Sequence, residues 1–271
     1  MIIDSHLHLW VNDPVRYPWS PIGGYIPKTE APLAHYLEVM DANGVDGAVF
    51  VQPTPYGWDN SYLLECKQSA PAKFKAVVLV DPLSDQAAES LERLVVDGAD
   101  GLRINLHLQP LEKWQDSAFS QLWVRCVALD LPVCLQLTPE YLPFVGQLAA
   151  EYPVRIILDH LARPTAGSVP EDDAFRALLH LAEQPNICVK LSGMNYYSAQ
   201  SAPYQDTWQL LQTVKESFGV ERCLWGSDFP FVEEHWSYRE NLDIIRNELG
   251  FSDQDLDWVL GRTAKSIWWK A

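Results

Sequence analysis

Histidine and carboxylate side chains stand in this sequence directly after short apolar runs. His6 and His8 follow the first run, His160 follows a later one and Asp228 follows the last. Imidazole and carboxylate groups transfer protons near neutral pH, and both are common zinc ligands. Three imidazoles and a carboxylate that share one cavity would form either a general-base cluster or a metal site.

The spacing of the first two histidines suits such a cluster. His6 and His8 are two residues apart, and side chains alternate along a strand, so both point to the same face. At roughly 3.3 Å per residue their backbones lie about 6.6 Å apart. Both imidazoles can therefore reach one metal ion or one substrate group.

The apolar runs themselves predict parallel strands. Each is nearly continuous in apolar residues, as expected for strands covered on both faces. They span residues 1–5, 47–51, 76–80, 101–105, 132–137, 154–158, 187–191 and 223–225. Most are separated by stretches with helical periodicity, for example 119–129, 175–181 and 208–214. This alternation predicts an α/β fold, a (β/α)8 TIM barrel, with residues 1–271 as a single domain.

An open doubly wound sheet is the alternative fold. It would place a glycine-rich phosphate loop after the first strand, where the sequence has Ser5-His6-Leu7-His8 instead. The long segment 10–32 is rich in proline, glycine and aromatic residues, which suggests a lid over the site. The tail from Ser252 onward is expected to be one more helix packed under the barrel.

In a closed barrel the carboxyl ends of all strands meet at one rim. Closure places the last strand beside the first, so Asp228 is expected next to the histidine pair. Alone, Asp228 could equally be a turn residue and Arg103 a structural ion-pair partner. The joint position of the four candidate residues at strand ends favours a functional site. Further polar residues at strand ends and on the loops of this rim are Gln52, Arg103, Asn105, Arg163, Lys190 and Tyr196.

Composition excludes several classes of protein. The chain of 271 residues has 36 acidic and 20 basic residues, a net charge of -16, and no basic run. A nucleic acid or an anionic membrane is therefore not expected as a partner. The expected partner is a small-molecule substrate. No signal peptide or membrane span is evident, and the five cysteines are scattered, which predicts reduced thiols in a cytoplasmic protein. The sequence does not decide whether the protein forms a homo-oligomer, which stays possible.

Several sequence blocks resemble a known family. Residues 4–10, Asp-Ser-His-Leu-His-Leu-Trp, resemble the first-strand signature of the amidohydrolase superfamily. The blocks at 101–103, 158–164, 189–193 and 225–230 resemble, in order, later motifs of its lactonase branch. That branch includes 2-pyrone-4,6-dicarboxylate lactonase and sugar lactonases such as fuconolactonase. The resemblance extends over nearly the whole chain.

The resemblance implies a mechanism and a ligand set. Asp228 would act as general base on the water that attacks a lactone carbonyl, while His6, His8 and His160 polarise the carbonyl or, with Asp228, hold a metal. Binuclear relatives carry a modified lysine after the fourth strand or a histidine after the fifth, and this chain has neither. The resemblance thus implies either no metal or one divalent ion, zinc by preference. Substrate contacts are expected from Arg103, Arg163, Lys190, Asn105, Gln52 and Tyr196.

The substrate expected is a carboxylated or polyhydroxylated lactone. The end of the fifth strand, residues 135–138, lacks the basic residue expected for a pyrone dicarboxylate, which argues against that exact substrate. A second reading is a metal-dependent decarboxylase of aromatic or dienoic acids, since such relatives share the same histidines and aspartate. An inactive binding barrel is disfavoured because every acid-base residue is present.

Overall fold

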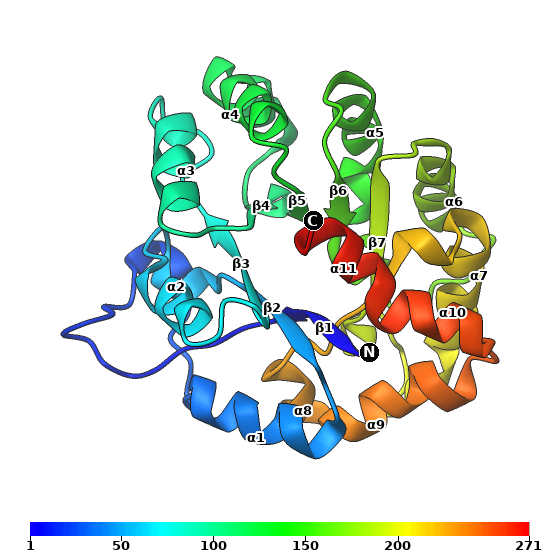
Figure 1. Cartoon of the computed structure of the whole chain (residues 1–271). Coiled ribbons are helices and arrows are strands. Elements are labelled where there is room, and N and C mark those ends of the chain that lie inside the picture. Colours follow the sequence, from blue (N-terminus) through cyan, green and yellow to red (C-terminus); the bar gives the residue numbers. More distant parts are fainter. Residues whose placement is uncertain (271) are drawn as a thin grey trace.

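The computed structural model describes residues 1–270 and contains one parallel sheet (Figure 1). Its eight strands are hydrogen-bonded in the order of the sequence. The strands are β1 Ile3–Leu7, β2 Gly47–Val51, β3 Phe74–Leu79, β4 Gly101–Asn105, β5 Val133–Gln136, β6 Ile156–Leu158, β7 Ile187–Leu191 and β8 Cys223–Trp225. This order is that of a TIM barrel and rules out the doubly wound alternative, whose strand order reverses at a switch point.

The barrel closes through the segment that follows β8. The Asp228 N–H donates to the His6 carbonyl at 2.8 Å, and the His8 N–H donates to the Phe229 carbonyl at 2.7 Å. Leu7 and Phe229 form the parallel bridge between these two segments. Closure thus joins the two parts of the chain that carry the first and last candidate site residues.

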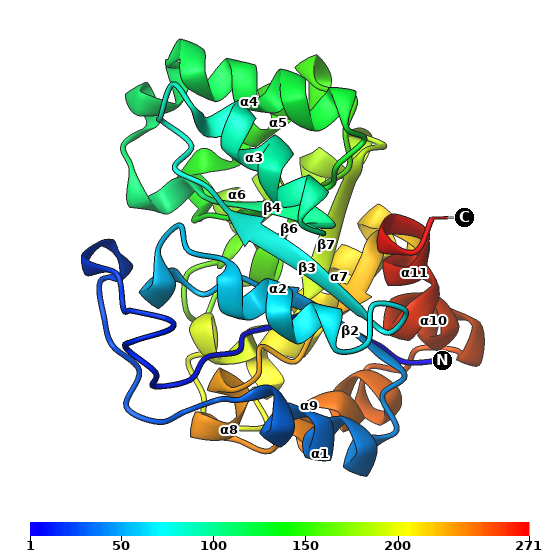
Figure 2. The same cartoon turned by 60° about the vertical axis from the view of Figure 1, so that its left-hand side comes forward.

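Helices surround the strands (Figure 2). They are α1 Leu33–Asn43, α2 Ser61–Gln68, α3 Ala87–Val96, α4 Ser117–Ala128, α5 Leu142–Glu151, α6 Asp173–His180, α7 Trp208–Phe218, α8 Phe231–His235, α9 Tyr238–Asp243, α10 Asp253–Asp257 and α11 Thr263–Trp268. Strand side chains that face outward pack with these helices in the larger of two apolar clusters. The second cluster fills the barrel itself.

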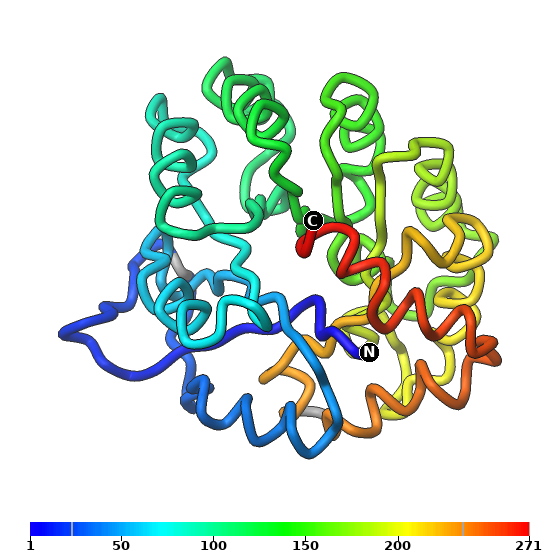
Figure 3. The backbone as a smooth tube through the Cα atoms, viewed as in Figure 1, coloured from blue at the N-terminus to red at the C-terminus, as the bar shows by residue number. Residues whose placement is uncertain are grey.

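The C-terminal segment plugs the lower end of the barrel. Ile267 and Trp268 of α11 belong to the same buried cluster as the inward-facing Ile3, Val49 and Ile157 of three strands. Figure 3 traces this segment, in red, across the centre of the barrel. The predicted tail helix packs under the barrel as expected, but a π-helical turn, Trp258–Arg262, separates α10 from α11.

Some strand limits differ from the prediction. β1 spans Ile3–Leu7 where the apolar run predicted 1–5, because pairing with β2 and the Phe229 segment holds the chain extended past the apolar residues. β6 is short and begins at Ile156. Strand ends are set by pairing partners, which the local apolar pattern does not contain.

Two further predictions from the sequence concern the state of the cysteines and the presence of membrane-spanning helices. The five cysteines are buried and free in the structure. Within residues 1–270, no helix has the length and apolar character that crossing a membrane requires.

Candidate active site

The three histidines and the late aspartate meet at one point inside the rim of the barrel. The Nε2 atoms of His6 and His8 lie 3.3 Å apart, and each is 3.5 Å from Asp228 Oδ1. His160 Nε2 lies 3.9 Å from the same oxygen. All four side chains are buried. Residues separated by more than 200 positions therefore share one cluster.

An irregularity in β1 aims the histidine pair inward. Ile3 faces the barrel interior three positions before His6, and an odd spacing would put the two on opposite faces of a regular strand. The register with β2 shifts between Asp4 and Leu7, which takes up the extra residue. Ile3 can therefore pack in the apolar plug while His6 and His8 face the cluster.

His160 reaches the cluster from an unusual backbone turn. Residues 160–163 all have left-handed φ values, from 50° to 59°. Such a run costs about 1–2 kcal/mol per non-glycine residue, so the surrounding structure must hold it. The His160 Nδ1 atom lies 2.9 Å from the Ser192 hydroxyl after β7. A Cβ atom on the next residue, Gly193, would lie 2.5 Å from the same ring nitrogen, so only glycine fits there.

Asp228 is held by a buried carboxylate that the sequence prediction did not include. Asp4 accepts the Ser227 N–H at 2.9 Å and the Ser227 hydroxyl at 2.6 Å, and it also accepts the Tyr238 hydroxyl at 2.9 Å. These bonds fix the turn in which Asp228 takes a left-handed φ of 59°. The sequence signal for Asp4 was its place in the first-strand motif.

A charged layer lies directly beneath His6. Asp159 Oδ1 is 2.9 Å from Lys190 Nζ and 3.3 Å from His6 Nδ1, and Asp159 Oδ2 is 3.4 Å from Arg103 Nε. Lys190 Nζ also lies 2.9 Å from His6 Nδ1. His6 Nδ1 thus faces both an ammonium that only donates and a carboxylate that only accepts. The tautomer with the hydrogen on Nδ1, toward Asp159, is the one that leaves an Nε2 lone pair toward the cluster, the arrangement common for metal-binding histidines.

The ring nitrogens of His8 are oriented in the same way. His8 Nδ1 lies 2.8 Å from the Val51 carbonyl oxygen, which only accepts hydrogen bonds. Nδ1 therefore carries the hydrogen, and the lone pair of Nε2 faces Asp228. The Tyr196 hydroxyl donates to Asp228 Oδ2 at 2.5 Å, while Oδ1 is buried without a hydrogen-bond partner. The carboxylate thus has one anchored oxygen and one available oxygen.

Electrostatics set the protonation states that this geometry needs. Burial lowers the pKa of His6 well below its usual value, and the Lys190 ammonium lowers it further. Burial also lowers the pKa of His160 to about 4. Burial by itself would raise the pKa of Asp228, but the positive charge that the facing imidazoles carry when protonated, His160 above all, holds it below its usual value. Near neutral pH, His6 and His160 are therefore neutral and Asp228 is ionised.

The donor atoms fit one metal ion. Nε2 of His6, Nε2 of His8 and an oxygen of Asp228 form the cluster of candidate ligands among the described residues. Zinc bonds of about 2.1 Å in tetrahedral geometry place neighbouring ligand atoms about 3.4 Å apart, close to the 3.3 and 3.5 Å observed here. With the hydrogens of His6 and His8 on Nδ1, two imidazole lone pairs and an unpartnered carboxylate oxygen at these distances repel one another unless a cation or a proton lies between them.

A cavity of about 330 Å³ opens above the cluster. His8, His160 and Asp228 line its floor, and His6 lies deeper. Of the residues expected to contact substrate, Arg103, Arg163 and Tyr196 line this cavity. The lid segment 10–32 contributes Gly24 and Tyr25, so it reaches over the site.

The other three expected contacts lie elsewhere. Lys190 is fully buried beneath His6, because its ammonium pairs with Asp159. Gln52 is buried and donates to the Asp59 carbonyl at 2.5 Å, and Asn105 lines a neighbouring cavity. His107, which the sequence prediction did not include, lines the site cavity two residues past Asn105. Its position beyond a strand end was the available signal.

Comparisons with known proteins agree with the family resemblance seen in the sequence. A family model for amidohydrolases matches residues 3–268. The 4-sulfomuconolactone hydrolase of Hydrogenophaga intermedia is 29% identical over 230 residues, covering 84% of this chain and 74% of the relative. The L-fucono-1,5-lactonase of Burkholderia ambifaria is 29% identical over 240 residues, covering 84% of this chain and 80% of the relative.

A solved structure agrees in fold along the whole chain. A Pseudomonas putida protein described as a candidate 2-pyrone-4,6-dicarboxylic acid hydrolase has a TM-score of 0.87 and 28% identity, and the match covers 98% of this chain and 97% of that one. The predicted resemblance to the lactonase branch is confirmed by these similarities. Because the family match extends from β1 to α11, the protein belongs to the amidohydrolase family.

Proposed function

We propose that this protein hydrolyses the ester bond of a lactone, with Asp228 as general base. The observation that carries the proposal is the unpartnered Oδ1 of Asp228, buried among three imidazoles at the floor of a cavity with two arginines in its lining. The lactone hydrolases among the relatives support the reaction class.

Asp228 Oδ1 accepts a proton from the attacking water, and the water oxygen forms a bond to the lactone carbonyl carbon. The ring C–O bond then breaks, and the proton returns from Asp228 to the leaving ring oxygen. The product is the open-chain hydroxy acid, so one water is consumed and the base is regenerated. Tyr196 keeps the carboxylate oriented through Oδ2. Burial and the Asp228 charge raise the pKa of Tyr196 well above its usual value, so it remains a donor.

His6, His8 and Asp228 would hold a single divalent ion, for which zinc suits the nitrogen and oxygen donors. When bound, such an ion would polarise the carbonyl and make the water more acidic. His160 completes the ring of imidazoles around the reacting carbonyl. Its Nδ1 is tied to Ser192, so its Nε2 is the atom that faces the substrate side.

Arginine side chains are proposed to hold an acidic or polyhydroxylated substrate. The Arg163 guanidinium lies 4.5 Å from the centre of the Tyr196 ring, and both residues line the cavity. Arg103 donates to Gln136 Oε1 at 2.8 Å and is near Asp159, so it is held in place for a carboxylate. Lys190, Gln52 and Asn105 are proposed to support these groups rather than to form first contacts with the reacting ring.

The reaction can be tested with a panel of carboxylated and sugar lactones monitored by a pH indicator. Asp228→Asn should lower kcat about 10²–10⁴-fold, because the base is lost while a group of similar size remains. A circular dichroism spectrum like that of the wild type would show that the fold is kept. Near-normal turnover in this variant would contradict the assigned role. Release of carbon dioxide from aromatic acids, with no lactone opened, would favour the decarboxylase reading instead.

The metal site can be tested without activity. Zinc added to chelator-treated protein should raise Tm, since a ligand at 100 times its Kd stabilises the folded state by about 2.7 kcal/mol. His8→Ala removes one donor and should reduce this zinc-dependent shift, whereas His107→Ala, outside the cluster of candidate ligands, should keep it. An equal shift in both variants would place the ion elsewhere.

A further inference from the structure

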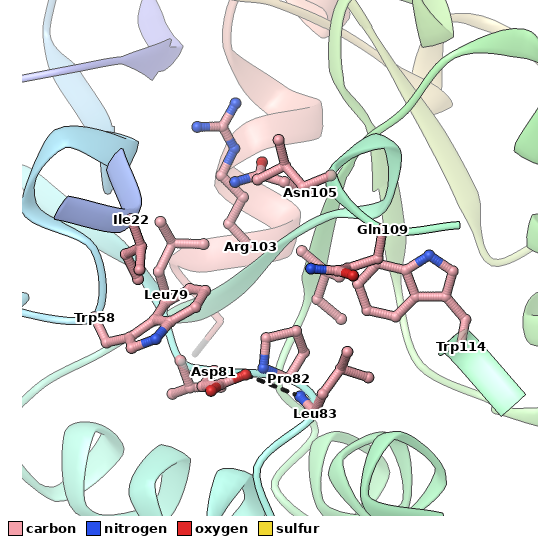
Figure 4. A pocket seen from close by; sticks show the side chains of 13 residues that line it. Ile22, Trp58, Leu79, Asp81, Pro82, Leu83, Arg103, Asn105, Gln109 and Trp114 are labelled. Atoms are coloured by element: carbon pink, nitrogen blue, oxygen red, sulfur yellow. Dashed lines mark hydrogen bonds between the residues drawn. The ribbon is translucent and has the colours of Figure 1, made fainter. Parts of the chain in front are cut away.

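A second cavity lies beside the proposed reaction site. It has a volume of about 380 Å³ and shares two of its lining residues, Arg103 and Leu108, with the cavity above Asp228. The lid contributes Ile22 to the second cavity and Tyr25 to the first. In Figure 4 the Arg103 guanidinium points away from the centre of the second cavity. Arg103 and Leu108 thus form the boundary between the two spaces.

Two tryptophans on opposite sides of this cavity form its walls (Figure 4). The Trp114 ring is fixed, because its Nε1–H donates to the Leu106 carbonyl at 3.1 Å and the ring packs on Phe119 with centroids 4.9 Å apart. Trp58 is 41% exposed, and Ile22 and Leu108 are each 54% exposed. Large apolar side chains around a cavity, left open to water, are typical of a surface that a ligand covers.

One polar side chain that lines the cavity has a buried atom without a partner. Asn105, which is 7% exposed, lines the cavity, and its Oδ1 atom is buried without a hydrogen bond. An unsatisfied buried carbonyl oxygen is costly, so a ligand that donates a hydrogen bond there gains binding energy. Asn105 lies two residues beyond Arg103 on β4, and both are at the same end of the cavity (Figure 4). Apolar walls with one directed polar group are the usual composition of a small-molecule site.

We propose that this cavity binds an aromatic arm of the lactone substrate. The lactone ring lies over Asp228, and the arm passes Arg103 and Leu108 so that its ring lies between Trp58 and Trp114. A hydroxyl or amine on the arm donates to Asn105 Oδ1. The inference rests on the proposed lactonase function, and it assigns the enzyme a substrate larger than a simple sugar lactone or ring dicarboxylate.

The first test compares two lactones with the same ring, one unsubstituted and one with a hydroxyphenyl arm. The wild type should favour the aryl lactone in kcat/KM by about tenfold, the scale of an aromatic contact in a shaped pocket. Trp58→Ala, which removes a wall, and Leu83→Trp, which fills the base, should each lower this ratio about fivefold. Trp258→Ala is the matched control, since this half-buried tryptophan lines neither cavity.

The second test measures binding without turnover. Isothermal titration with 3-(4-hydroxyphenyl)propionate should give a Kd that rises about fivefold in Trp58→Ala and stays unchanged in Trp258→Ala. If the acid binds in this way but no lactone is opened, the proposed reaction fails and the subsite stands. If lactones are opened without an aryl preference, or with one that neither cavity substitution alters, the subsite is overturned and the lactonase function stands.

Discussion

At the scale of single residues, Asp159 is the group on which the buried charges beneath the site depend. It lies within 3.4 Å of Lys190, His6 and Arg103, and no other carboxylate is paired with Lys190 in the described chain. Burial would raise the pKa of Asp159, but Lys190 and the other facing groups hold it well below its usual value. The carboxylate therefore stays ionised and keeps the neighbouring lysine compensated.

Asp159→Asn should destabilise the protein by about 3–5 kcal/mol, because it leaves the buried Lys190 ammonium without a countercharge. Urea unfolding measures this change. The control is the double variant Asp159→Asn with Lys190→Met, which removes both charges and should lose less than the sum of the two single variants. A single-variant loss below about 0.5 kcal/mol would show that the pair is not coupled in this way.

At the scale of elements, the turn after β7 decides where the His160 ring lies. Gly193 has a φ of 65°, and the space beside its Cα is filled by the His160 imidazole. Glycine is thus required in this turn for two reasons: the backbone conformation is left-handed, and the His160 ring approaches the Cα closely. Gly44, after α1, has nearly the same φ of 66°, but no atom lies within 4 Å of the position that an alanine methyl group would take there.

Alanine variants of these two glycines distinguish the effect of backbone strain from the effect of a changed site geometry. Gly44→Ala should cost about 1–2 kcal/mol in stability, because alanine is unfavourable in a left-handed conformation. Gly193→Ala should cost at least as much, because its methyl group also meets the His160 ring. Only Gly193→Ala should also lower kcat/KM, by up to about 100-fold, since it displaces the His160 ring, which we propose to face the reacting carbonyl. Equal kcat/KM values for the two variants would contradict the requirement for glycine at the site.

At the scale of the whole molecule, the barrel has an apolar end and a reactive end separated by one charged layer. Trp268 closes the apolar end in contact with the inward-facing strand residues. The Lys190 ammonium lies 5.9 Å above the ring of Trp268 and directly beneath His6. Stability and chemistry are thus assigned to opposite ends of the same cylinder.

Trp268→Ala should therefore destabilise the protein by about 3–5 kcal/mol, the usual cost of removing a buried aromatic side chain. The kcat of the folded fraction should remain close to that of the wild type, because the site is built from the other end. Trp258→Ala, on the same segment but only half-buried, should cost clearly less. Thermal unfolding measures the stability of each variant, and active-site titration gives the folded fraction to which kcat is referred. A large fall in kcat per folded molecule of Trp268→Ala would argue against this separation.

The sequence alone determined the barrel and the residues of the central cluster. Apolar periodicity is a local property of the chain, so the strands at 47–51, 101–105, 187–191 and 223–225 agree with the structure residue by residue. Because the rim of a parallel barrel gathers every strand end, the convergence of His6, His8, His160 and Asp228 could also be predicted. The family resemblance added the reaction class.

Only the tertiary structure decided how these residues are held and which others face the cavity. The irregularity in β1, the support of Asp228 by Asp4 and the pairing of Asp159 with Lys190 depend on contacts between segments far apart in the chain. The same contacts place Lys190 beneath the site and Arg163 beside it. Hydrophobic pattern fixes which end of a strand a residue occupies, whereas closure and side-chain packing fix what that residue touches.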